Sequence, residues 1–264
     1  MKIAIIGEQS KKSGGSYHQS LKTYGLLSKI KEFEFIFLNI NLKNESNQKN
    51  ARSINYNINF IDRLFFLFNS SKILKLFLKK FNIQNKFETF IKKEKIDLIL
   101  FLGCTRLAEF CDKINYVTYI YEFHHIFRPD LPEYKEWADF DFRETLLNTN
   151  VKKSVSLIVD TEKKKDGIVK YYNCHKEKIN VIPLSSNISV ANKQVTKFDV
   201  EQINNWDAEN NNFFFYPAQY WSHKNHFYIL EAIKTLNSKY NKKTKFFFAG
   251  HRKNNFNYIK KKNR

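Results

Sequence analysis

Residues 86–103 read KFETFIKKEKIDLILFLG, and this stretch decides the fold class. Its first half is rich in lysine and predicts a basic helix, whereas Ile96–Leu102 is an almost unbroken apolar run. A short apolar run of this kind, placed directly after a helix, is typical of a parallel strand buried on both faces. The stretch therefore predicts a helix, a tight turn and a strand of an α/β sheet.

The same alternation of helix and strand extends outward from this stretch in both directions. On the N-terminal side, we predict a strand at 2–7, a helix at 17–30, a strand at 32–40 and a loop at 44–57, followed by two helices, or one kinked helix, between 60 and 81. On the C-terminal side, we predict a short helix at 105–112, a strand at 115–122, an irregular segment at 124–138, a helix at 140–150, a strand at 154–160, a helix capped by Thr161 and a strand at 178–184. This order favours a doubly wound parallel sheet.

The pattern restarts at residues 213–233, FFFYPAQYWSHKNHFYILEAI. We predict a strand, a loop that releases His223, Lys224 and His226, a helix capped by Ser222, and then a strand at KFFFAG. One β–α–β unit cannot cover both faces of its own sheet, so this second sheet should be incomplete. The predicted organisation is an N-terminal domain at 1–190, a linker at 191–210 and the start of a second Rossmann-like domain at 211–264.

Composition favours packed domains and an anionic partner. Hydrophobic residues make up 42% of the 264 residues, which excludes a disordered chain as the default. The 45 Lys and Arg exceed the 26 Asp and Glu by 19, a balance that suits nucleic acid, an anionic membrane or phosphorylated substrates. Because Lys, Asn, Ile and Phe crowd the whole chain, part of this charge reflects a general compositional bias, which weakens the nucleic-acid interpretation.

The cysteines and the N-terminal residues point to a reducing cytosol. Cys104, Cys111 and Cys174 are odd in number and form no C-x-x-C pair, so neither a disulfide framework nor a structural metal site is indicated. The apolar run in the opening MKIAIIGEQS is too short for the core of a signal peptide. No window reaches the roughly 18 apolar residues that a membrane span needs.

Three places combine a strand end with polar or glycine residues, where ligands of parallel sheets bind. After the first strand, Gly14 and Gly15 permit close approach of a phosphate, although a flexible turn explains them equally well. After the strand at 115–122, His125 could act as a base or electrostatic stabiliser, or be a hydrogen-bonded structural residue. After the strand at 213–217, Gln219 and Lys224 could meet a diphosphate, or simply begin a solvated helix.

Two other features have plainer interpretations. Asp139 and Asp141 imitate a metal-binding Asp-x-Asp, but they enter a predicted helix, and acidic residues stabilise helix N-termini, so we predict no metal site. The lysine-rich helices between 60 and 95 could lie on an anionic membrane, although a packed core with a solvated basic face is the default.

Several stretches resemble one enzyme family. Residues 216–233, YPAQYWSHKNHFYILEAI, resemble the start of the second domain of the retaining GT-B glycosyltransferases called group 1 or family 4, including a mannosyltransferase-like subgroup. Residues 155–187 resemble the closing strand–helix–strand of that family's first domain. The stretch YEFHHIFRPDLPE at 121–133 resembles its His-containing acceptor-side loop.

The resemblance implies a fold and an activity. The fold would be α/β, GT-B type, with two Rossmann-like domains. The activity would be retaining transfer of a hexose from a nucleotide-sugar to a saccharide or lipid-linked acceptor, without a metal or other cofactor, in surface polysaccharide or lipopolysaccharide assembly at the cytoplasmic face of the membrane. By position, Gly14 and Gly15 would lie against the donor diphosphate and sugar, with Gln219 and Lys224 on the phosphates and the catalytic candidate His125 near the sugar.

The sequence departs from the family pattern in two places. Gln219 stands where most of the family has Arg, and no Glu, seven residues, Glu motif follows Gly250, so we expect a C-terminally truncated second domain. A catalytically inactive fragment or interaction module is therefore the alternative hypothesis. A basic nucleic-acid binder is a third, for which the sequence offers no recognition motif.

Overall fold

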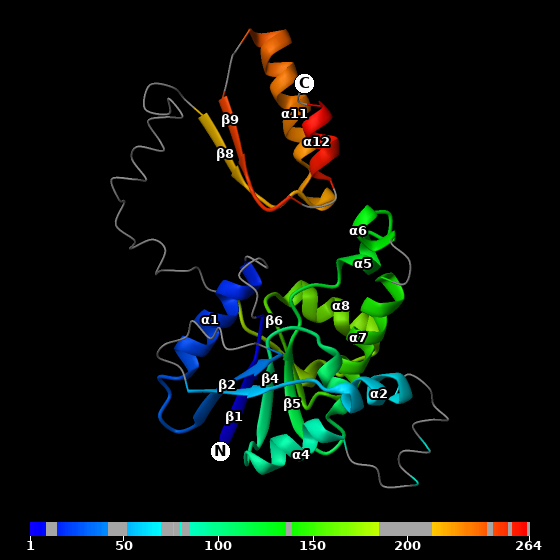
Figure 1. Ribbon diagram of the computed structural model, residues 1–264. Helices are drawn as coiled ribbons and strands as arrows, with labels where there is room; N and C mark the ends of the chain where they lie inside the picture. The colour runs from blue at the N-terminus through cyan, green and yellow to red at the C-terminus, as the bar shows by residue number, and fades with distance from the viewer. Residues whose placement is uncertain are drawn as a thin grey trace. The chain divides into compact units, whose positions relative to one another are not determined.

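The computed structural model describes residues 1–8, 15–41, 52–69, 76, 80, 85–135, 139–184, 213–241, 245–252 and 255–262. The chain divides into two compact units (Figure 1). The first unit comprises Met1–Phe123 and Asp141–Ser186, and the second comprises His124–Phe140 and Asn187–Arg264. A segment from the middle of the chain thus belongs to the C-terminal unit.

Within the described residues, the first unit is built on a seven-stranded sheet whose neighbouring strands are all parallel. Its strands are β1 (Lys2–Ile6), β2 (Glu34–Ile40), β3 (Ser53–Tyr56), β4 (Leu98–Phe101), β5 (Asn115–Tyr119), β6 (Ser156–Val159) and β7 (Ile179–Val181). Their order in the sheet is β3-β2-β1-β4-β5-β6-β7. The predicted doubly wound parallel sheet is therefore confirmed, and it includes the strand inferred at 96–102.

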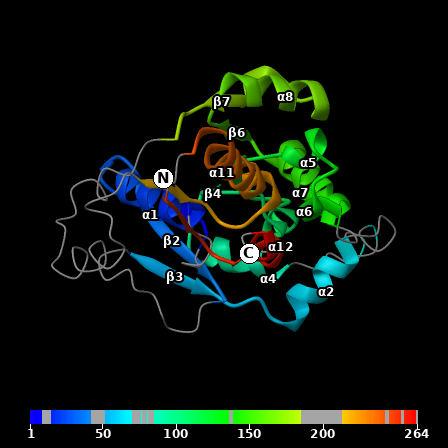
Figure 2. The same ribbon diagram turned by 90° about the horizontal axis from the view of Figure 1, so that it is seen from above.

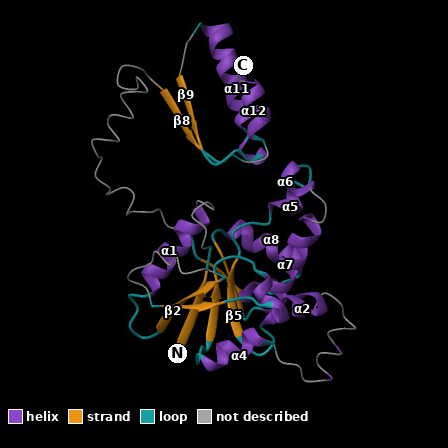
Figure 3. Ribbon diagram, in the orientation of Figure 1, coloured by secondary structure: helices purple, strands orange, loops and turns teal. Residues whose placement is uncertain are grey.

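Helices connect these strands (Figures 2 and 3). They are α1 (Gly15–Leu27), α2 (Phe60–Asn69), α4 (Lys86–Lys93), the 3₁₀ turn η2 (Arg106–Phe110), α7 (Asp139–Lys153), α8 (Glu162–Tyr172) and the 3₁₀ turn η3 (Lys176–Lys178). Thr161 caps α8 as predicted, because its side chain accepts a hydrogen bond from the Lys164 N–H at 3.3 Å.

The core lies on both faces of the sheet, because alternate strand residues point to opposite sides. Ile5 and Phe37 pack on the face of α1, where Tyr24 meets Phe37 edge-on with ring centroids 5.5 Å apart. Leu38 belongs to the opposite face and shares a cluster with Ile91 of α4. Burial on both faces explains why the strands lack the apolar–polar alternation of a half-exposed sheet.

We predicted a loop at 44–57, and this prediction is wrong for Ser53–Tyr56, which form the edge strand β3. The strand escaped notice because two of its four residues are polar. Asn55 is accommodated at this edge by a side-chain hydrogen bond from Asn39 of β2, at 2.9 Å, while Tyr56 is buried. Pairing with β2, rather than a local apolar pattern, therefore creates β3.

Two further predictions need correction or lie outside the described residues. The segment 124–138 was predicted to be irregular, but it forms two four-residue helices, α5 (His124–Phe127) and α6 (Pro132–Lys135). Of the helical stretch predicted between 60 and 81, the first part is confirmed as α2, and most of the rest lies outside the described residues. The linker predicted at 191–210 also lies outside them.

The C-terminal part of the second unit contains a β–α–β arrangement, as predicted. Its elements are β8 (Phe213–Pro217), the 3₁₀ turn η4 (Ser222–Lys224), α11 (His226–Tyr240), β9 (Lys245–Ala249) and α12 (Phe256–Lys262). The strands β8 and β9 are parallel, with Phe215 opposite Phe247. In Figures 1 and 3, α11 and α12 lie beside one another next to this strand pair.

Candidate functional site

The first unit has a cavity at the point where its strand order reverses. The chain runs outward from β1 to β2 and β3, then returns to β4 on the other side of β1. Ligands of open parallel sheets bind at such switch points, beyond the carboxyl ends of the strands. A cavity of about 580 Å³ lies there, lined by residues that include Gly7, Glu8, Ser16, Cys104, Arg106 and Tyr121.

Gly7 brings the exit of β1 close to α1. A β-carbon at this position would lie 2.5 Å from the Ser20 hydroxyl oxygen, so only glycine fits without displacement. The same hydroxyl accepts from the Glu8 N–H at 2.9 Å and donates to the Ser16 carbonyl at 2.9 Å. This network fixes the backbone that lines the cavity. Gly7 was not predicted from the sequence, because its partner Ser20 lies thirteen residues away. The only sequence feature that marks Gly7 is its place directly after a strand.

The cavity wall is polar and carries one acidic and one basic residue, Glu8 and Arg106. The Arg106 guanidinium lies over the Phe66 ring, 4.5 Å from its centroid, and pairs with Glu109 at 3.3 Å. Burial raises the pKa of the Cys104 thiol to about 12, so this cysteine stays protonated and is not a thiolate nucleophile. Burial also raises the pKa of Tyr121 above its ordinary value. The wall thus offers a carboxylate, a guanidinium and neutral hydrogen-bonding groups, which suits a polar ligand.

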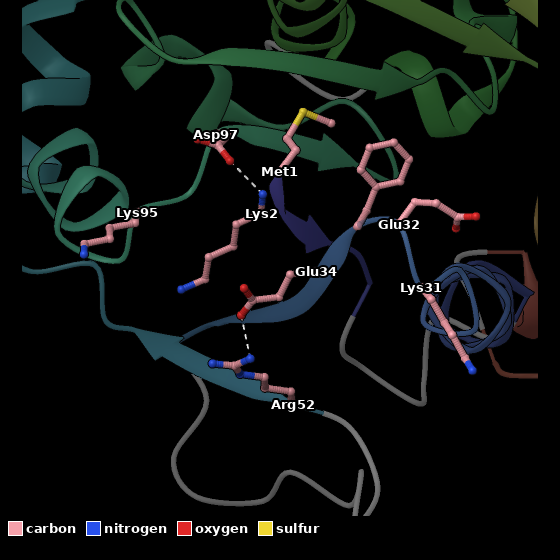
Figure 4. A pocket seen from close by; sticks show the side chains of 9 residues that line it. Met1, Lys2, Lys31, Glu32, Glu34, Arg52, Lys95 and Asp97 are labelled. Atoms are coloured by element: carbon pink, nitrogen blue, oxygen red, sulfur yellow. Dashed lines mark hydrogen bonds and ion pairs between the residues drawn. The ribbon is translucent and has the colours of Figure 1, made fainter.

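A second, more open cavity of about 720 Å³ lies at the amino ends of the strands (Figure 4). The Lys2 N–H donates to Asp97 at 2.7 Å, and Arg52 pairs with Glu34 at 2.5 Å. Figure 4 shows that the Lys31 and Lys95 side chains extend to opposite sides of it. Because this is the edge opposite the carboxyl ends of the strands, we do not assign the functional site to it.

In the second unit, the loop between β8 and α11 is packed closely against the end of β9. A β-carbon on Gly250 would lie 2.1 Å from the Ala218 carbonyl oxygen and 2.8 Å from the Gln219 α-carbon. The Tyr220 N–H donates to the His251 carbonyl at 3.2 Å. The loop is thus held by backbone contact as well as by side chains.

Gln219 and Lys224 both lie on this loop. The half-buried Gln219 accepts from the indole N–H of Trp221 at 2.8 Å. The Lys224 side chain is exposed, while its carbonyl accepts from the Tyr216 hydroxyl at 2.7 Å. The predicted cap at Ser222 is wrong: Ser222 begins η4, and Asn225, in the left-handed conformation at φ 50°, caps α11. Asparagine tolerates this conformation, which lets the 3₁₀ turn precede the helix.

His125 also belongs to the second unit, but it is buried. Its side chain is 3% exposed and meets the Phe140 ring edge-on, with centroids 5.3 Å apart. Its neighbour Glu122 belongs to the first unit and pairs with Arg143 at 3.5 Å. The structure therefore places His125 in a packed environment, and its catalytic role stays a prediction.

Of the two glycines predicted near a phosphate, Gly14 lies outside the described residues. Gly15 is exposed at the first turn of α1, and a β-carbon there would meet nothing within 4 Å. Gly15 and the loop that carries Gln219 and Lys224 lie in different units.

His226, which the sequence placed with His223 and Lys224 where the helical pattern begins, is completely buried. Its ring stacks on Tyr220, with centroids 4.4 Å apart and planes inclined by 14°. It also meets Tyr216 and Phe248 edge-on at 5.1 and 5.5 Å. Burial lowers the pKa of His226, so the ring is neutral and acts as an aromatic core residue of the loop.

This burial predicts an acid-sensitive second unit. The unfolded chain binds a proton at His226 below about pH 6.5, whereas the folded unit resists it, so the free energy of unfolding should fall as the pH drops through that value. Between pH 7.5 and pH 5.5, the midpoint temperature of thermal unfolding should fall for the wild type by about 3 °C more than it falls for His226→Phe. Equal losses in both proteins would contradict the assignment.

Among the described residues, no cluster of three or more His, Cys, Asp or Glu could hold a metal ion. No helix in the described part of the chain has the length and apolar content required to cross a membrane.

Comparison with known proteins shows the fold. No protein-family model and no curated protein sequence matches the chain. Among solved structures, a glycosyltransferase from Rickettsia africae is 16% identical with a TM-score of 0.54, covering 97% of this chain and 70% of its own. Anabaena HepE in complex with UDP and glucose is 13% identical with a TM-score of 0.61, covering 100% and 65%.

A TarM variant from S. aureus, in complex with fondaparinux, α-GlcNAc-glycerol and UDP, is 11% identical with a TM-score of 0.61, covering 99% of this chain and 74% of its own. The fold is of the GT-B type. The first sheet and the smaller second sheet both take part in these matches, since they cover nearly the whole chain. The chain spans about two thirds of the length of the HepE structure.

Proposed function

We propose that the chain is a glycosyltransferase that moves a hexose from a nucleotide-sugar donor to a saccharide or lipid-linked acceptor. The observation that carries the proposal is the loop before α11, where the exposed Lys224 stands at the entry of a 15-residue helix. Free N–H groups at a helix N-terminus favour bound anions, and a lysine adds a full positive charge. The match to HepE with UDP and glucose supports a nucleoside diphosphate as the anion.

In the proposed reaction, negative charge develops on the diphosphate as the bond to the sugar breaks. Lys224 and the first amides of α11 would stabilise this charge, and Gln219 would add a hydrogen bond. A cation fixed in advance by the protein can do this without a metal ion, so we propose a metal-independent reaction. Retention of configuration, the roles of Gly14 and Gly15 at the donor, and the role of His125 near the sugar form part of the same proposal.

We propose that the cavity of the first unit takes the acceptor. Its polar wall, which includes Glu8, Arg106 and Tyr121, suits the hydroxyl groups of a saccharide or of a lipid-linked sugar. By the family resemblance, the product would serve surface polysaccharide or lipopolysaccharide assembly. The enzyme would then work in the cytoplasm, in peripheral contact with the inner face of an anionic membrane.

Calorimetric titration of the purified chain with UDP, GDP and their sugar conjugates tests the proposal. Saturable binding of one nucleotide series, with no requirement for added Mg²⁺, is expected. A folded chain that binds none of these ligands would overturn the proposal.

One observation favours the alternative of an interaction module. Phe213 and Phe215, which share one face of β8, are 43% and 53% exposed, and exposed apolar groups gathered on one face often mark association surfaces. Concentration-dependent association, without nucleotide binding, would support this alternative. Binding of nucleic acid would instead weaken steeply with added salt.

A further inference from the structure

Glu133 of α6 contacts the loop that carries Lys224, although the two are far apart in sequence. Its carboxylate oxygen Oε1 accepts from the His223 main-chain N–H at 3.1 Å and lies 2.6 Å from the Nδ1 atom of the same residue. Both residues belong to the second unit, to which the segment His124–Phe140 contributes α6. A single carboxylate oxygen therefore holds both the backbone and the ring of His223.

The environment of Glu133 makes this contact energetically important. The side chain is only 4% exposed, and its second oxygen, Oε2, is buried without a hydrogen-bond partner in the described structure. Burial alone raises the pKa of Glu133, but hydrogen bonds led by the His223 ring lower it below its ordinary value, so the group is a carboxylate at neutral pH. A buried carboxylate is tolerated when hydrogen bonds compensate for its lost hydration, and the main-chain N–H and the ring of His223 supply them.

The turn just before α11 is held both by the Glu133 contact and by a tyrosine hydroxyl. His223 is the middle residue of the three-residue turn η4. The next residue, Lys224, donates its N–H to the Trp221 carbonyl at 3.1 Å and accepts from the Tyr216 hydroxyl at 2.7 Å. The backbone of Lys224 is thus held at a defined place, and its exposed side chain remains available to a ligand.

We propose that Glu133 is a positioning residue for the phosphate-binding loop: it holds η4 so that Lys224 is presented at the start of α11. The inference rests on the proposed function for the ligand, a nucleoside diphosphate, but not for the loop geometry. The helix α6 would then set the conformation of a loop that lies about 90 residues later in the chain. The sequence did not suggest this role.

The loop geometry can be tested without any ligand. In a Trp137→Phe, Trp206→Phe background, Trp221 is the sole tryptophan, and it lies two residues before His223. Acrylamide quenching of Trp221 should increase in Glu133→Ala, increase less in Glu133→Gln, which keeps an acceptor oxygen, and stay unchanged in Asp130→Asn. Asp130 is a matched control, because it is an exposed carboxylate that pairs with Arg128. Unchanged quenching in Glu133→Ala would overturn the proposal.

Ligand binding distinguishes positioning from a general loss of structure. Calorimetry should show UDP binding about tenfold weaker in Glu133→Ala, with a smaller loss in Glu133→Gln and unchanged affinity for uridine, which lacks phosphates. Equal losses for UDP and uridine would indicate only a structural role and overturn the proposal. If the wild type binds no UDP, the proposed function fails, whereas the quenching experiment still decides whether Glu133 holds the loop.

Discussion

Gly250→Ala should unfold the loop before α11 and destabilise the second unit by roughly 3 kcal/mol. The added methyl carbon would lie 2.1 Å from the Ala218 carbonyl oxygen and 2.5 Å from the Ala218 carbonyl carbon. These are backbone atoms between β8 and the loop, so no side-chain rotation can relieve the overlap. The strand β9 or the loop must move, and either movement strains the contact between Tyr220 and His251.

Urea unfolding followed by Trp221 fluorescence, in the background where Trp221 is the sole tryptophan, measures this effect. Gly25→Ala is the matched control, since a β-carbon there meets nothing within 4 Å and Gly25 lies inside α1. Alanine is favoured over glycine in a helix interior, so this control should be neutral or slightly stabilising. An unchanged unfolding midpoint for Gly250→Ala would show that the loop does not pack against β9.

The glycines of this chain differ in how well their roles could be predicted from the sequence. The Gly14–Gly15 pair attracted attention because two adjacent glycines are visible locally. Gly250 and Gly7 matter because of atoms that belong to other elements, Ala218 and Ser20, and no local pattern announces such contacts. Sequence reasoning thus found where the chain turns, but not which glycines are sterically required.

The sheet itself was predictable because doubly buried strands carry a continuous apolar signal, as in Ile96–Leu102. The edge strand β3 was not, since an edge tolerates polar residues such as Asn55 when a neighbouring strand supplies a partner. The same reasoning applies to His226. In the sequence it stands with His223 and Lys224 where the helical pattern begins, whereas stacking on Tyr220 makes it part of the core.

For the candidate site, the sequence predicted the position of the loop but not the contacts that hold the loop. The strand–loop–helix pattern at 213–233 correctly placed Gln219 and Lys224 between β8 and α11. The contact from Glu133 could not be foreseen, because a carboxylate in a short segment after β5 has no sequence signature that links it to His223. The cap at Asn225 was missed for a related reason, since a 3₁₀ turn separates Ser222 from the helix.

Lys224→Ala should weaken binding of UDP and UDP-sugars by at least about tenfold, because a charge-assisted contact to phosphate is lost. Uridine affinity should not change. Lys224→Arg should retain most of the affinity, since it keeps the positive charge. Calorimetry at two salt concentrations provides the measurement, and the wild type should lose more affinity with salt than Lys224→Ala, since one cation–phosphate contact is missing from the variant.

Lys234→Ala is the matched control, because Lys234 is an exposed lysine on the same helix α11, ten residues further along the chain. It removes the same net charge from the unit, so a general electrostatic attraction would make the two variants equal. A specific contact instead requires that only Lys224→Ala loses affinity for the diphosphate. If both variants lose the same affinity for the diphosphate, the phosphate site does not lie on the β8–α11 loop. The description of the fold would not be affected by that result.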